Sequence, residues 1–400
     1  MRVIGLMSGT SADGVDAALV EWPEGVLESP LRLVAFRADP FPPAFQRRIH
    51  ELAAGRVPAA EVLAELAGLD VELGERFAAS AAALAAEAGV ELSEIDAIAS
   101  HGQTVAHHPE RHATLQIGDP SVIAERTGCT TVADFRPRDL ALGGEGAPLA
   151  PFFHHAAFAD ATEARAVLNL GGIANLTWLP PGGRAQDVIA FDVGPANALI
   201  DGVVRTLSGG RESFDRDGAR AARGRPDAGL LERLLNDAFL RRAPPKSTGR
   251  ERYGLVEAEA LVRESRTVGR GEDDLLATLV AFSVEAVRRA CQDFLSPKAS
   301  LARLFVGGGG AENPVFMAAL ARALAPARVE PMDAAGVPAR ACEAMAFALL
   351  GRNALLGRPN HLPRCTGAAR AAVLGEIVPG RARTARSVGA GAKGDVGSEA

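Results

Sequence analysis

Two stretches of the chain share one pattern, in which an apolar run, a glycine-containing turn and a second apolar run follow each other. The first stretch is Arg2–Trp22, and its turn is Ser8–Gly14. The second is Ala166–Leu179, and its turn is Gly171–Asn175. Apolar runs of strand length on both sides of turn residues are typical of β-hairpins. We therefore predict that two parts of the chain each open with a hairpin.

Other parts of the pattern also occur twice. A strand-like run ends in glycine at Ile95–Gly102, and another does so at Leu301–Gly310. Apolar residues recur at helical spacing in Ala59–Gly89 and in Asp274–Phe294. The recurrence predicts a duplicated α/β fold, in which two similar domains face each other across a cleft that holds the ligand.

The predicted domains are residues 1–163 and residues 164–380. The boundary is placed at the polar stretch Asp160–Arg165, just before the second hairpin. Residues 381–400 are rich in Gly, Ala, Ser and charged residues without any periodicity, so we predict a disordered tail there.

Composition narrows the function classes. The 400 residues are 48% hydrophobic and carry a net charge of -6, and no basic run is broken by aromatic residues, so nucleic-acid binding is not expected. The apolar run Leu275–Val287 is too short to cross a bilayer, and no secretion signal is recognisable at the N-terminus. The cysteines lack the spacing of zinc or redox motifs and indicate reduced thiols in the cytoplasm: Cys129, Cys291, Cys342 and Cys365.

The turn Gly9–Asp16 holds small residues, two hydroxyls and two carboxylates. Backbone amides in such a turn can surround phosphate oxygens, and Asp13 or Asp16 can hold Mg²⁺ directly or through water. The alternative is that glycine and aspartate serve turn geometry alone. Both interpretations remain open from these residues.

Asp192 follows the strand-like run Val188–Ala190 and precedes an apolar helical run, Ala198–Leu207. That position suits a general base or a metal ligand, but it also suits a turn or helix-capping aspartate. The basic run Pro244–Arg252 either reaches a ligand or is exposed charge. The histidines, His101 among them, are more typical of structural residues than of metal ligands, because none forms a ligand spacing with a carboxylate.

Nucleotide binding through the common motifs is excluded. The sequence contains no G-x-x-x-x-G-K-[ST] and no G-x-G-x-x-G between a strand and a helix. The paired hairpins offer another architecture, since the actin/hexokinase/Hsp70 superfamily holds ATP phosphates between two such turns. There the adenosine lies against a late glycine-rich turn, and Gly307–Gly310 occupies the corresponding place here.

Nine motifs in order resemble the anhydro-N-acetylmuramic acid kinase family over residues 1 to 378. They are GLMSGTSADGVDAAL (5–19), SHGQTVAHHP (100–109), TLQIGDPSVIAERTG (114–128), VADFRPRDLALGGEGAPLAP (132–151), NLGGIANLT (169–177), FDVGPANALID (191–201), PKSTGRE (245–251), GGGGAENP (307–314) and EAMAFALL (343–350). The ordered set is far more specific than any one motif.

The resemblance implies a ribonuclease-H-like, actin/hexokinase/Hsp70-type fold in two copies and a homodimer. It implies that 1,6-anhydro-N-acetylmuramic acid, ATP and water are converted, with Mg²⁺, to N-acetylmuramic acid 6-phosphate and ADP in cell-wall recycling. Asp192 matches the family's catalytic aspartate, and the residues that match its ATP-binding positions are Gly9, Thr10, Ser11, Ala12, Asp13, Gly14, Val15, Asp16, Gly171, Gly172, Gly308 and Gly309. Arg136, Glu343 and His101 match substrate positions, and the metal ligands stay unknown, with Asp13 acting through water as one candidate.

Two points are left open by the motifs. Arg136 is expected to pair with the lactyl carboxylate of the sugar, but Arg138 is nearly as good a candidate. The sequence also departs from the family's usual residues, with Ala12 for Leu, Val193 for Thr, Ala196 for Gly, and Asn360-His361 for Gly-Asn. The competing functions are an ATP-driven binding module on the same fold and a kinase for an unbridged amino sugar.

Overall fold

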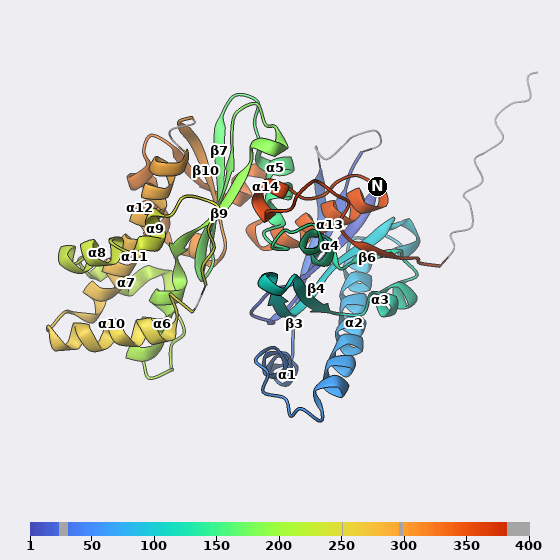
Figure 1. Cartoon of the computed structure of the whole chain (residues 1–400), viewed down its shortest axis with the longest axis horizontal. Coiled ribbons are helices and arrows are strands. Elements are labelled where there is room, and N and C mark those ends of the chain that lie inside the picture. Colours follow the sequence, from blue (N-terminus) through green and yellow to red (C-terminus); the bar gives the residue numbers. More distant parts are fainter. Residues whose placement is uncertain (24–30, 250, 296–298, 382–400) are drawn as a thin grey trace, which may run out of the picture.

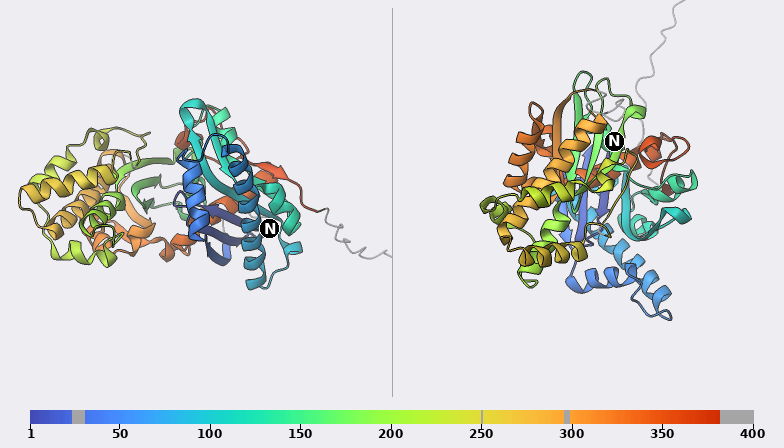
Figure 2. Two further views of the ribbon diagram at one scale, coloured as in Figure 1. Left: turned by 90° about the horizontal axis from the view of Figure 1, so that it is seen from below. Right: turned by 60° about the vertical axis from the view of Figure 1, so that its left-hand side comes forward.

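The computed structural model describes residues 1–23, 31–249, 251–295 and 299–381, and shows two mixed sheets side by side, each with its own helices (Figures 1 and 2). The tail predicted to be disordered lies outside the described residues, apart from Arg381. Within the described ranges, no helix combines the length and the apolar character that a bilayer crossing requires.

The first sheet begins with an antiparallel meander. β1 pairs with β2 and β2 with β3, while β4 and then β6 are added in parallel on the other side of β1. β12 closes that edge by pairing antiparallel with β6, and β5 pairs with the far end of β4. The strands are β1(Arg2–Ser8), β2(Gly14–Glu21), β3(Arg32–Pro40), β4(Ala97–His108), β5(Ala113–Ile117), β6(Thr131–Ala133) and β12(Glu376–Val378).

The second sheet repeats this topology. β7, β8 and β9 form the antiparallel meander, and β10 and β11 are added in parallel beside β7. The strands are β7(Ala164–Leu170), β8(Ile173–Leu179), β9(Ile189–Pro195), β10(Leu301–Gly307) and β11(Arg328–Pro331). Both sheets thus have the strand order and directions of the ribonuclease-H-like fold, and the predicted duplication and both predicted hairpins are confirmed.

Helices supply the crossovers that parallel strands require. The predicted helices are confirmed as α2(Val62–Glu87) and α11(Glu272–Ala290), and each presents a buried apolar face to its sheet. The others before α13 are α1(Pro43–Ala53), α3(Pro120–Thr127), α4(Phe135–Ala141), α5(Ala150–Phe158), α6(Asn197–Leu207), α7(Ala219–Arg223), α8(Ala228–Leu235), α9(Ala238–Arg241), α10(Leu255–Thr267) and α12(Pro314–Leu324).

The C-terminal segment returns to the first sheet. α13(Cys342–Leu355) packs on β1 and β4, α14(Pro363–Thr366) follows, and β12 is an edge strand of that sheet. The sequence-based prediction assigned all of residues 164–380 to the second domain, whereas α13 and β12 contact the first sheet. The reason is burial: nearly every residue of α13 is buried, because one of its faces lies on the first sheet and another on α5.

Candidate functional site

The turn between β1 and β2 is closed by a hydrogen bond of 3.0 Å from the Ala12 N–H to the Gly9 carbonyl. Ala12 is fully buried and has a φ of 46°, so a side chain occupies a left-handed turn position. Helix α1 supports the turn from outside, where Gln46 Nε2 and His50 Nε2 each lie 3.0 Å from the Ser11 carbonyl oxygen. Of the predicted residues 9–16, residues 9–13 therefore form a hydrogen-bonded turn, and residues 14–16 begin β2.

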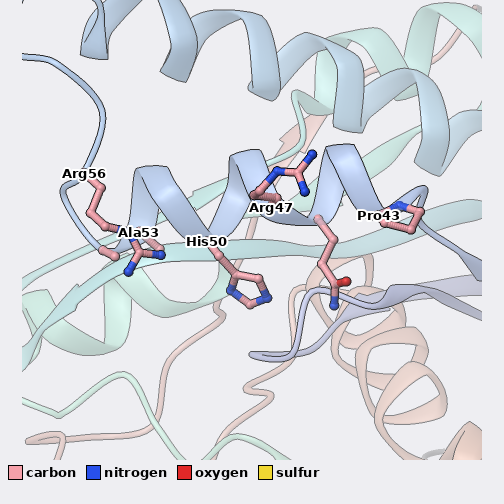
Figure 3. A pocket seen from close by; sticks show the side chains of 7 residues that line it. Pro43, Arg47, His50, Ala53 and Arg56 are labelled. Carbon is pink, nitrogen blue, oxygen red and sulfur yellow. The ribbon is translucent and has the colours of Figure 1, made fainter. Parts of the chain in front are cut away.

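A cavity of about 640 Å³ lies on α1 beside this turn (Figure 3). Its side chains give it cationic groups but no carboxylate. None of the predicted site residues lines it, but its lining residues Gln46 and His50 contact the Ser11 carbonyl oxygen, so it borders the predicted ATP-binding turn. The lining residues are Pro43, Gln46, Arg47, His50, Ala53, Ala54 and Arg56.

The second hairpin turn lies against the late glycine turn. Asn197 Nδ2 donates to the carbonyls of Leu170 and Gly171, both at 2.9 Å, and fixes the hairpin end. Gly308 has a φ of +77°, and a Cβ there would lie 2.3 Å from Asn169 Oδ1, so only glycine fits. A Cβ on Gly309 would meet nothing within 4 Å. The structure brings the predicted glycines of both turns together and leaves Gly309 with open space in front of it.

Asp192 lies in β9 and is held by the segment that follows α9. The Thr248 N–H donates to Asp192 Oδ2 at 2.9 Å, and the Ser247 hydroxyl donates to the same oxygen at 3.3 Å. Burial raises the pKa of Asp192, and the two hydrogen bonds act against that rise. Among the described residues, Oδ1 has no hydrogen-bond donor, so one carboxylate oxygen is positioned and the other is available to a ligand.

Arg136 and His101 form a direct pair. Arg136 Nε and Nη2 lie 3.1 and 2.9 Å from His101 Nε2, while His101 Nδ1 lies 2.9 Å from the Gly102 carbonyl oxygen. Burial and the neighbouring guanidinium lower the pKa of His101 to about 3, so the imidazole is neutral near pH 7. The neutral ring donates from Nδ1 and accepts at Nε2, and it thereby orients the guanidinium.

Carboxylates gather near this pair. Burial raises the pKa of Glu343, at the start of α13, and the charge of Arg136 opposes the rise. Burial and Asp13 raise the pKa of Asp16 to about 6, with Arg340 acting against them and Glu343 adding to them. Asp16 therefore interacts electrostatically with Asp13 in the first hairpin turn and with Glu343.

Sequence reasoning missed a buried network that supports Arg136. His361 Nδ1 and Thr366 Oγ1 lie 2.6 and 2.7 Å from Asp139 Oδ1, and the Gly146 N–H donates to Asp139 Oδ2 at 2.8 Å. The Gly146 carbonyl in turn accepts from Arg136 Nη1 at 2.7 Å. The DFRPRD motif and the unusual residue at 361 were both visible in the sequence, but their contact depends on the return of the C-terminal segment.

No group of three or more metal-ligating side chains occurs in the part of the chain that the structure describes. The charge of Asp13 acts on Asp16, so the first hairpin turn and the start of β2 carry two nearby carboxylates. A Mg²⁺ ion there would need phosphate and water oxygens to complete its shell, which suits an ion that arrives with a nucleotide.

Comparison with known proteins decides the family. The family model described as Anhydro-N-acetylmuramic acid kinase matches residues 1–380. The chain belongs to this family. The anhydro-N-acetylmuramic acid kinase of Gloeobacter violaceus is 46% identical over 94% of this chain and 98% of its own length. That of Caldanaerobacter subterraneus subsp. tengcongensis is 40% identical over 94% and 96%.

A solved structure is also similar to this chain. Component A of the (R)-2-hydroxyglutaryl-CoA dehydratase of Acidaminococcus fermentans aligns with a TM-score of 0.42 and 12% identity, over 87% of this chain and 96% of that one.

One departure from the family's usual residues lies at the start of α6. Ala196, where the family usually has Gly, is fully buried and has a φ of −116° and a ψ of −101°. Ala196 also donates its N–H to the Gly172 carbonyl at 3.0 Å, so it supports the second hairpin turn of this kinase.

Proposed function

We propose that this protein converts 1,6-anhydro-N-acetylmuramic acid, ATP and water to N-acetylmuramic acid 6-phosphate and ADP, in the recycling of cell-wall sugar. Family membership over residues 1–380 supports the reaction. The observation that carries the mechanism is the carboxylate of Asp192, half-buried and held by one oxygen only.

Asp192 acts as the general base. Its ionised carboxylate takes a proton from water while the water oxygen attacks the anomeric carbon, as the base of an inverting glycosidase does. The bond from the anomeric carbon to the bridging oxygen breaks, and that oxygen becomes O6 of the opened sugar. O6 then attacks the γ-phosphoryl group in line, and ADP leaves. The leaving group of the first step is the nucleophile of the second.

The two glycine turns hold the nucleotide. Backbone amides of the turn after Ser8 and of Gly171 and Gly172 would donate to phosphate oxygens, while the open space in front of Gly309, beside Gly308, would take the adenosine. Asp13 would hold Mg²⁺ through water, and the ion would supply positive charge to the phosphates. Residues 9–16 contain no lysine or arginine, so this cation would be needed to offset the negative charge of the phosphates.

Arg136 recognises the lactyl carboxylate, and His101 and Glu343 complete the sugar side. Replacing Arg136 by Ala is expected to raise KM for the anhydro-sugar by about tenfold to a hundredfold, because a charge-assisted bidentate pair is lost. KM for ATP should stay within about twofold. The measurement is initial-rate kinetics with each substrate varied in turn.

Arg138→Ala is the matched control for Arg136. Arg138 is exposed and donates to the Val373 carbonyl at 2.8 Å, so its loss should leave KM for the sugar near the wild-type value. The reverse result, with a large effect at 138 and none at 136, would transfer the carboxylate contact to Arg138.

The reaction itself is tested by mass spectrometry of the product formed from 1,6-anhydro-N-acetylmuramic acid and Mg·ATP in ¹⁸O-water. We expect a phosphorylated sugar with one ¹⁸O at the anomeric carbon. Phosphorylation without ¹⁸O, or phosphorylation of unbridged N-acetylmuramic acid in preference, would contradict the coupled hydrolysis and indicate an ordinary amino-sugar kinase.

We also propose that the enzyme works in the cytoplasm as a homodimer. Four buried thiols support a reducing compartment. Size-exclusion chromatography with light scattering would test the dimer directly.

A further inference from the structure

The side chain of Lys246 is buried against α9. Its side chain is 5% exposed, and Nζ lies 3.2 Å from the Phe239 carbonyl oxygen and 3.0 Å from that of Leu240. Both carbonyls belong to the last turn of α9, where a cation is favoured by the orphan acceptors of a helix end. The ammonium therefore ties the start of the 246–248 segment to α9.

Three aromatic rings complete the surroundings of the ammonium. Nζ lies 4.7 Å from the ring centre of Phe239, 5.2 Å from that of Phe294 and 5.8 Å from that of Phe191. Cation–π attraction at these distances offsets part of the cost of burying the charge. Phe191 directly precedes Asp192, so the same aromatic cluster also contacts the strand that carries the carboxylate.

The residue type itself supports a specific role. The chain contains only 3 lysines among its 43 basic residues, so arginine is used almost everywhere else. A planar guanidinium is larger than an ammonium and spreads its donors over a wide fork, whereas the ammonium is a compact charge that fits between two carbonyls and three rings. The compact ammonium of lysine therefore suits position 246 better than the guanidinium of arginine.

The anchored segment is the one that holds Asp192. The Lys246 carbonyl accepts from the Asp192 N–H at 3.1 Å, and the next two residues donate to Asp192 Oδ2. We propose that Lys246 is a positioning residue for Asp192, whose buried ammonium fixes the 246–248 segment and so fixes the donors on Oδ2. This inference rests on the proposed function of Asp192 as the general base, and it assigns Lys246 no contact with substrate.

The charges around both groups are few. Burial and Arg242 lower the pKa of Lys246 to about 8, and Asp192, Asp237 and Asp293 oppose them. Asp192 is influenced by Lys246 and, in the other direction, by Glu251. Lys246 can therefore affect Asp192 in two ways, by fixing the geometry of the 246–248 segment and by its own charge. The test has to separate these two effects.

The test compares Lys246→Met, Lys246→Gln and Ser247→Ala with the wild-type enzyme. In Lys246→Met we expect kcat to fall by about tenfold or more, because the base moves relative to the attacking water, while KM for ATP changes by less than about twofold. The acid limb of the kcat/KM profile should move up by about half a pH unit or more, since donors that favour the carboxylate are displaced.

Two further variants keep the result interpretable. Lys246→Gln retains an amide donor for one of the two carbonyls, so its kcat and acid limb should lie between those of the wild-type enzyme and Lys246→Met. Ser247→Ala removes one donor without touching the anchor, and its acid limb should move up by a smaller amount. If Lys246→Met fails to fold, these two variants carry the test.

Arg242→Met is the matched control. Arg242 is an exposed cation just after α9, so its loss changes local charge without releasing the segment, and the acid limb should stay in place. A comparable shift in Arg242→Met would favour a general charge effect and contradict the positioning role.

Two other outcomes have distinct meanings. A lower melting temperature in the Lys246 variants with an unchanged acid limb and unchanged kcat would show a structural role alone and overturn the inference. If Asp192→Asn keeps most of its activity, the proposed base is wrong, and that result is separate from any result at Lys246.

Discussion

Replacing Asp192 by Asn is expected to lower kcat for the anhydro-sugar by about a thousandfold or more, because an amide cannot take a proton from the attacking water. The substitution keeps the size and shape of the side chain. The amide oxygen can still accept from the Thr248 N–H, which now lies 2.9 Å from Oδ2, so ATP affinity should hardly change. Steady-state kinetics and product analysis in ¹⁸O-water give the measurement.

The pH profile adds a second readout for the same variant. Burial raises the pKa of Asp192 above its usual value, and the base works only when it is ionised. Activity of the wild-type enzyme should therefore rise as pH increases through this raised pKa and be lost below it. The residual activity of Asp192→Asn should lack this acid limb.

Asp187→Asn provides a control for the asparagine substitution. Asp187 lies just before β9 and pairs with the exposed Arg184 at 2.7 Å. Its loss should leave kcat within about twofold of wild type, since exposed ion pairs contribute little. Activity of Asp192→Asn within about tenfold of wild type would rule out general-base catalysis by this residue.

Replacing Gly5 by Ala is expected to destabilise the fold by about 3 kcal/mol or more, because the added methyl group has no space. A Cβ at Gly5 would lie 1.8 Å from the Ala344 carbonyl oxygen and 2.7 Å from the Ala348 nitrogen. Both atoms belong to the backbone of α13, so no side-chain rotation can relieve the overlap. The helix that carries Glu343 would have to move away from β1.

Urea unfolding followed by tryptophan fluorescence measures this effect. The chain has one buried tryptophan near each sheet, Trp22 at the end of the first hairpin and Trp178 in the second. We expect the Trp22 signal to be lost at lower urea in Gly5→Ala, since α13 packs on the first sheet.

Gly68→Ala is the matched control for Gly5→Ala. A Cβ at Gly68 would meet nothing within 4 Å, and the residue lies inside α2. Alanine should therefore stabilise the protein by about 0.5 to 1 kcal/mol through its higher helix propensity. Equal effects at the two positions would show that α13 does not approach β1 as closely as the structure has it.

Much of the fold could be predicted because its signals are local. The hairpins at Arg2–Trp22 and Ala166–Leu179 and the helices α2 and α11 depend on residues close together in the chain, and all four are confirmed. The duplication followed from the order of these elements. The place of α13 and β12 could not be read in this way, because it depends on which sheet has an uncovered face and a free edge.

In the candidate site, too, some features could be predicted from local sequence and others depend on tertiary contacts. Asp192, Arg136, Glu343 and the glycine turns were found by motif, and their roles remain predictions. The support for them was invisible: the run around Lys246 was interpreted as a ligand contact or exposed charge, and its lysine is in fact buried behind Asp192. Asp139 and His361 are separated by more than half of the chain, and no local pattern indicates their contact at 2.6 Å.

The sequence by itself determined the elements, their duplication and the family, because periodicity, turn residues and ordered motifs are properties of neighbouring positions. The tertiary structure alone decided which groups hold the site residues in place. His101 behind Arg136, Thr248 on Asp192 and α13 against Gly5 are contacts between distant segments. Such contacts form where the segments bury their apolar faces together, and that outcome depends on the packing of the whole chain.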